Sequence, residues 1–130
     1  MSENAVVDEV EEFLRGRSRE LTTPRPGECL ACFVARMLRS FGCDTTLRWA
    51  QEFRDQRAPK ATALERRLGD MGGFCDCEIF LNGISMVDRL LATNPATGEP
   101  ERWPQQLPSC EGVRLGSTRW CGVWERVRRW

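Results

Sequence analysis

Apolar residues recur every three or four positions along the first half of the chain, which is the spacing of one face of an α-helix. The clearest pattern covers 28–41, where the large apolar side chains fall on one stripe and Gly42 follows as a natural stop. Similar patterns predict helices over 46–57 and 60–71. A further amphipathic helix at the N-terminus should end near Gly16 and pack its apolar stripe on the core.

The second half of the chain favours strands and loops. Residues 74–81 alternate like a strand, with Asn82 and Gly83 as a tight turn, and the strand would place Cys75 and Cys77 on one face. A short helix over 85–91 and a loop rich in proline and glycine over 94–108 should follow. The segment 113–130 indicates one or two terminal strands. The chain is therefore expected to be an α+β protein, with three or four helices packed on a small antiparallel sheet that a cysteine-bound metal stabilises.

These patterns divide the chain into four parts. We expect an N-terminal amphipathic helix over 1–18, a linker over 19–28, a cysteine-containing core domain over 29–83 and a divergent C-terminal extension with Trp- and Arg-rich strands over 84–130. The linker is indicated by two prolines and a glycine, which cannot continue a helix.

Composition and charge narrow the function classes. The 130 residues carry no net charge, and 29% of them are charged, which is ordinary for a globular protein and gives no global attraction to nucleic acid or acidic membranes. The acidic N-terminus lacks the basic start and apolar run of a signal peptide, and no stretch is apolar enough to span a bilayer. We therefore expect a cytoplasmic protein, in which thiols stay reduced.

Two close cysteine pairs are the most informative chemistry in the chain. Seven cysteines are present and histidine is absent. Cys29 and Cys32 are spaced i, i+3 at a helix start, off its apolar stripe, and Cys75 and Cys77 are spaced i, i+2. Each pair points two sulfurs the same way, as a four-thiolate zinc site requires. The predicted ligands of Zn²⁺ are therefore Cys29, Cys32, Cys75 and Cys77.

Cys43 is the alternative ligand. It lies too far along the helix from Cys29 and Cys32 to share a metal with them while that helix is intact. Cys43 therefore either joins Cys75 and Cys77 from the far end of the helix or takes no part in the site. Cys110 and Cys121 lie alone in the extension and have no partner at ligand spacing, so we expect them to be dispensable.

The string of residues 72–79, Gly-Gly-Phe-Cys-Asp-Cys-Glu-Ile, with Cys-Asp-Thr-Thr-Leu-Arg upstream at 43–48, resembles the domain-of-unknown-function 2695 (DUF2695) family of small bacterial proteins. The likeness covers roughly 43–83. The upstream Cys-x-x-Cys helix resembles that of an actinobacterial branch, in agreement with eighteen arginines against one lysine. The family has no assigned activity. The resemblance implies that Cys43 belongs to a shared motif, in which many relatives have histidine where this chain has Thr45.

The leading functional hypothesis is a small zinc-binding protein with a structural or interaction role. The alternative is a thiol–disulfide redox protein that uses the Cys-x-x-Cys and Cys-x-Cys pairs, because a helix N-terminus lowers thiol pKa values. No strand precedes Cys29, so the thioredoxin context is missing. No catalytic or cofactor-binding residue is assigned, and the enzyme question is left open with a preference for a non-catalytic role.

Two further functional hypotheses depend on charged residues. Hydrolysis would be possible if Asp76 or Glu78 acted as a general base beside a zinc ion with a free coordination position. In a strand, however, both carboxylates would point away from the thiols. The tail over 113–130 carries five arginines, one glutamate and three tryptophans, a pattern that can bind nucleic acid. We instead expect that tail to be a packed strand. The partner is unknown, and a protein partner is compatible with an interaction module.

Overall fold

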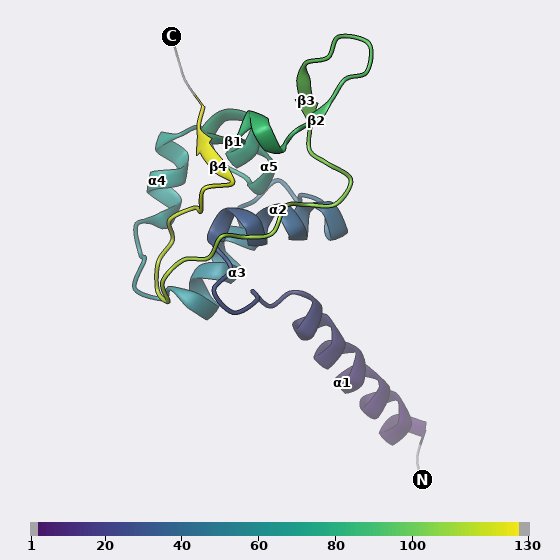
Figure 1. Cartoon of the computed structure of the whole chain (residues 1–130). Helices are drawn as coiled ribbons and strands as arrows, with labels where there is room; N and C mark the ends of the chain where they lie inside the picture. Colours follow the sequence, from purple (N-terminus) through teal and green to yellow (C-terminus); the bar gives the residue numbers. More distant parts are fainter. Residues whose placement is uncertain (1–2, 128–130) are drawn as a thin grey trace.

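The computed structural model describes residues 3–127 and has the α+β architecture that the sequence predicts (Figure 1). Short antiparallel strands pair beside a group of helices, while α1 extends away from the rest of the molecule. The helices are α1 (Glu3–Leu21), α2 (Leu30–Phe41), α3 (Arg48–Arg57), α4 (Leu64–Asp70) and α5 (Asp76–Glu78), with a π-helical turn at Ile79–Gly83 and a 3-10 turn at Asp88–Leu90. The strands are β1 (Ile84–Met86), β2 (Ala92–Thr93), β3 (Pro100–Arg102) and β4 (Trp124–Arg126).

Helix α2 forms the centre of the core, as its strong apolar stripe predicts. Its side chains Phe33, Val34 and Met37 are buried, and the ring of Phe33 packs on Phe53 of α3 with centroids 5.9 Å apart. The backbone N–H of Gly42 donates to the last turn of α2, and a φ of 79° there ends the helix in a conformation that glycine adopts easily.

The predicted strand over 74–81 is wrong. Cys75 is extended and serves as the N-terminal cap residue of α5, and the chain then continues as helical turns to Gly83. Burial in this segment does not follow the alternation of the sequence. The polar Asp76 is fully buried and hydrogen-bonded, whereas Cys77 is only half-buried. The strand comes directly afterwards, as β1, where a short helix over 85–91 was expected.

Strand β1 pairs antiparallel with β4, which joins the middle of the chain to its tail. Ile84 lies opposite Arg126, and Met86 lies opposite Trp124. A second pair, β2 with β3, forms a hairpin whose second strand lies in the segment 94–108, which was expected to be a loop. Of the tail, only Trp124–Arg126 forms a strand, with Trp124 buried, and residues 113–123 form loops and turns. The expectation of a packed strand is therefore met over these three residues, while residues 128–130 lie outside the described part of the chain.

Two helices differ in extent from the prediction. Helix α4 covers only Leu64–Asp70, because residues 58–63 form turns, and α1 continues past Gly16 to Leu21. The apolar stripe of α1 does not pack on the core, since 66% of Phe13 is exposed, as are Val10 and Leu14. None of the described helices combines the length and the apolar character that a membrane crossing requires.

Candidate metal centre

Four thiols gather where the start of α2 meets the tail. The sulfurs of Cys29, Cys32, Cys110 and Cys121 all lie within 4.8 Å of one another. Cys29, Cys32 and Cys121 are buried, and Cys110 is half-buried. None of the four forms a disulfide. We refer to these residues as the four-thiol group.

The first two thiols are positioned by the N-terminus of α2. Cys29 is the cap residue of the helix, with an extended backbone, and its sulfur accepts a hydrogen bond from the N–H of Cys32 at 3.3 Å. Cys32 lies in the first turn. Cap residues of this kind point their side chains at the free N–H groups of the first turn, so the spacing i, i+3 brings both sulfurs to the same helix end.

The C-terminal extension carries the other two thiols, Cys110 just before the tail and Cys121 within it. The N–H of Val113 donates to the carbonyl of Gly27 at 2.9 Å, which ties the chain after Cys110 to the residues just before α2. Beyond Cys121, Val123 and Trp124 are buried and lead into β4. The sulfurs of Cys32 and Cys121 approach to 3.7 Å.

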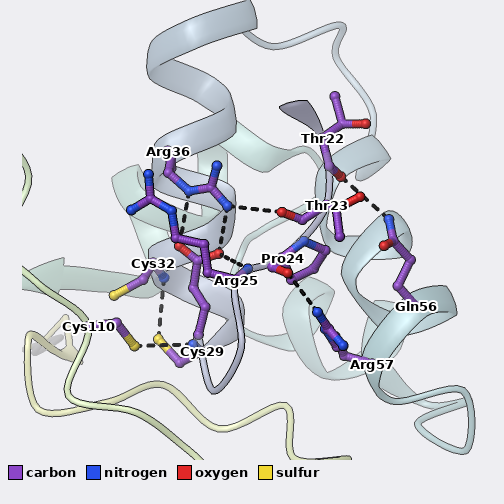
Figure 2. A network of polar contacts seen from close by, with 11 residues as sticks. Thr22, Thr23, Pro24, Arg25, Cys29, Cys32, Arg36, Gln56, Arg57 and Cys110 are labelled. Atoms are coloured by element: carbon purple, nitrogen blue, oxygen red, sulfur yellow. Dashed lines mark hydrogen bonds and ion pairs between the residues drawn. The ribbon is translucent and has the colours of Figure 1, made fainter. Parts of the chain in front are cut away.

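Backbone and indole N–H groups point at three of the sulfurs. The Cys110 sulfur accepts from the N–H of Cys29 at 3.2 Å and from the N–H of Gly112 at 3.3 Å. The indole N–H of Trp124 donates to the Cys32 sulfur at 3.3 Å. Figure 2 shows the contacts of Cys29 with Cys32 and Cys110. Such donors stabilise thiolates, which are the form that binds metal.

The thiols differ in how readily they ionise. Hydrogen bonds from the side chain and the backbone of Cys32 lower the pKa of Cys29 to about 6, although burial opposes this shift. The same interaction with Cys29, together with burial, raises the pKa of Cys32. Burial also raises the pKa of Cys121 to about 11. Without a cation, the group therefore holds one thiolate more easily than several, as expected when like charges share a small space.

A cavity of about 370 Å³ borders the four-thiol group, with Cys32 and Cys110 in its wall. On the same wall Arg36 forms an ion pair with Glu28 at 2.7 Å and donates to the carbonyl of Thr23, which anchors the segment before α2 (Figure 2). The cavity gives small solutes a route to the half-buried Cys110.

The predicted ligands do not lie in one group. Cys29 and Cys32 are in the four-thiol group, whereas Cys75 and Cys77 lie beside Cys43, where the chain after α2 meets the start of α5. Cys43 has the thiols of Cys77 and Cys75 as neighbours, and its role as a metal ligand stays a prediction. The face of α2 that carries Cys29 and Cys32 is also buried, because the tail covers it.

Cys110 and Cys121 are the residues that sequence reasoning missed. They are eleven positions apart, and no helix or strand expected from the sequence contains both, so no local spacing marks them as a pair. The count of cysteines was the signal that could have identified them. A site of four among seven cysteines left three without a role, and these two were among the three.

The two carboxylates considered as general bases have other surroundings. Asp76 is fully buried, and its carboxylate accepts hydrogen bonds from the N–H groups of Trp49 at 2.8 Å and Ala50 at 3.2 Å. Burial raises the pKa of Asp76 to about 6. Asp76 therefore caps α3 from a distant part of the chain, and each of its carboxylate oxygens accepts a backbone N–H. Glu78 is half-exposed and interacts with the thiol of Cys75.

The fold and the four-thiol group define a small α+β protein with a cysteine cluster that can hold a metal ion. The model of the DUF2695 family, described as a protein of unknown function, matches residues 30–82 and confirms the resemblance that the sequence motif indicated. The matched segment contains Cys32, Cys43, Cys75 and Cys77 but ends before the tail. The comparison with curated proteins found no match, and neither did the comparison with solved structures.

Proposed function

We propose that the chain binds one zinc ion through Cys29, Cys32, Cys110 and Cys121, and that this ion has a structural, non-catalytic role. The observation that carries the proposal is the mutual approach of four sulfurs within 4.8 Å. Zinc binds four thiolates at about 2.3 Å in a tetrahedron, so neighbouring sulfurs lie a little under 4 Å apart. The 3.7 Å between the sulfurs of Cys32 and Cys121 fits that geometry and is far longer than the roughly 2.05 Å of a disulfide bond.

The charge balance also supports a cation. Four thiolates and one Zn²⁺ leave a net charge of about −2, which the N–H donors at Cys110 and Cys32 and the N-terminus of α2 partly offset. Arg36 contributes little, because Glu28 already neutralises it.

The origin of the ligands favours a structural role. Two thiols come from the start of α2 and two from the C-terminal extension, so an ion there would hold the extension and the tail on the core. A closed site of four protein ligands leaves no position for a substrate, in contrast to catalytic zinc sites. We place such a protein in the cytoplasm, where unpaired thiols stay reduced and available, and regard an interaction module as its broader class.

Elemental analysis of protein purified without added metal tests the proposal. We expect about one tightly held zinc per chain, released by a chelator together with loss of the folded tail. Cys110→Ser and Cys121→Ser should lose this zinc. The matched control is Ser109→Ala, which changes a hydroxyl next to Cys110 and should keep it. Retention of zinc by both serine variants to the level of the control would contradict the proposal.

The redox alternative is favoured by one observation, the pKa of about 6 for Cys29. That thiol is 0% exposed, so an oxidant must enter through the cavity at Cys110. If the purified protein contains no metal and forms a reversible disulfide within the four-thiol group in a glutathione redox titration, thiol redox chemistry replaces zinc binding as the function.

A further inference from the structure

The three cysteines outside the four-thiol group lie together at a different place in the fold. Cys43 follows the end of α2, Cys75 caps α5 and Cys77 lies within α5. All three are half-buried, which distinguishes them from the buried thiols of the first group. The two groups together account for all seven cysteines of the chain.

Cys43 is the common neighbour of the other two thiols. Its side chain interacts with the thiols of both Cys77 and Cys75. The carboxylate of Glu78 interacts in turn with the thiol of Cys75. Cys77, Cys43, Cys75 and Glu78 therefore form a series of neighbouring donors, each beside the next, and thiolate and carboxylate are donor types that zinc accepts.

A buried frame holds the two segments that carry these donors. The N–H of Asp76, between Cys75 and Cys77, donates to the carbonyl of Thr46 at 3.0 Å. The carboxylate of the same residue holds the first N–H groups of α3. Through its backbone N–H and its carboxylate, Asp76 thus holds the start of α5 against the loop after Cys43 and against the start of α3.

We propose that Cys43, Cys75 and Cys77 form a second site for a thiophilic divalent metal ion of the zinc type, with Glu78 as the fourth donor. This site does not depend on the four-thiol group. Its sulfurs are more widely spread than those of the four-thiol group, so the ion draws them in by rotation of half-exposed side chains on a fixed backbone. Side-chain rotation of this kind is fast and needs no change of fold.

The second site differs from the first in exchange behaviour. Its donors are open to water, so the bound ion is reached by competing ligands and leaves more easily than an ion enclosed by the tail. All three thiols lie inside the segment 30–82 that matches the family, whereas the four-thiol group includes residues beyond it. The open site is therefore the one contained wholly in the family segment.

Cobalt titration of the full chain in its reduced, metal-free form tests this inference, with Co²⁺ as the probe. We expect two equivalents to bind, each with sulfur-to-cobalt charge-transfer absorption, the second with less absorption per ion because it has three thiolates. Cys43→Ser should bind one equivalent only. Glu78→Gln should still bind two, the second at least about 10-fold more weakly, because loss of even a residue that supports a metal ligand costs about 10–100-fold and Glu78 binds the ion directly.

A matched variant separates the two sites. Cys121→Ser should lose the tight equivalent and keep the weaker one, which is the reverse of Cys43→Ser. If the chain binds one equivalent and Cys43→Ser binds the same amount, the second site does not exist. If Cys121→Ser retains both equivalents while Cys43→Ser loses one, the second site stands and the proposed structural zinc site fails.

Alkylation followed by mass spectrometry gives the same answer without any substitution. With two equivalents of Zn²⁺ present, Cys43, Cys75 and Cys77 should be protected, and a weak chelator should expose these three before the four thiols of the first group. Equal alkylation of the three with and without Zn²⁺, or conversion of Cys43 and Cys77 to a disulfide under the same reducing conditions, would overturn the proposal.

Discussion

Asp76 shows how a single buried side chain can cap a helix from a distant part of the chain. Burial of a carboxylate costs free energy unless hydrogen bonds compensate for lost water, and Asp76 has two such bonds from the start of α3. The residue before α3, Leu47, provides no side-chain cap, so Asp76 performs this role from a distant part of the chain.

Asp76→Ala should therefore destabilise the protein by about 1–3 kcal/mol at neutral pH, since it leaves two buried N–H groups without an acceptor. Urea unfolding measures this change. The matched control is Asp44→Ala, which removes an exposed carboxylate that accepts from the N–H of Thr46. Water can replace that acceptor, so the control should cost less than about 1 kcal/mol. Equal losses in the two variants would contradict the capping role.

For single residues, the sequence predicted those contacts that join neighbours in the chain. Cys29 and Cys32 were identified as a pair because a helix turn fixes their spacing, and the structure keeps them together. Their partners Cys110 and Cys121 could not be identified, because contact across 81 and 89 positions depends on tertiary packing that no local pattern records. For the same reason the burial of Asp76 was unforeseen.

At the scale of elements, the Gly72–Gly73 pair explains why the chain turns sharply between α4 and α5. Gly72 has a φ of 85°, which glycine adopts without strain. Gly73 is required for a different reason, since a Cβ atom there would lie 3.1 Å from a side-chain carbon of Ile79 and 3.2 Å from the carbonyl oxygen of Leu68.

Gly73→Ala should consequently destabilise the protein by about 1–3 kcal/mol through overpacking, because the backbone oxygen cannot move aside freely. Thermal unfolding gives the measurement. Gly16→Ala is the comparison, since nothing lies within 4 Å of that position in α1 and alanine favours helix. A Gly73→Ala protein that melts with wild-type stability would show that the close approach is absent in solution.

The helices were more predictable than the strands for a physical reason. Helices α2 and α3 are long enough for several repeats of apolar spacing, and each was placed within two residues at both ends. Strands β1 and β4 have three residues each, too few to show alternation, and they form because residues far apart in the chain pair with each other. The strand prediction over 74–81 failed because cysteines and acids alternate there as in a strand, whereas the chain forms helical turns.

For the molecule as a whole, the core begins after α1. The carbonyls of Thr23 and Pro24 accept hydrogen bonds from Arg36 and Arg57, so the segment that follows α1 is anchored. Helix α1 itself presents an exposed apolar stripe and extends away from the other elements.

A chain that starts at Thr22 should therefore unfold in urea at the same midpoint as the full chain. A chain that starts at Pro26 is the matched control, because it also loses the acceptors of Arg36 and Arg57, and its midpoint should fall. A lower midpoint for the first truncation would mean that α1 contributes to the stability of the core.

The wide separation of the four thiols along the chain has a consequence for turnover of the protein. Cys29 and Cys110 are 81 positions apart, so an ion that holds both would act as a cross-link and lower the conformational entropy of the unfolded chain. The stabilisation from closing so long a loop is about 4 kcal/mol in the corresponding case of a disulfide. Unlike a disulfide, the proposed cross-link would open when the metal supply falls. The tail would then become accessible to proteases, and the lifetime of the protein in the cell would follow the supply of zinc.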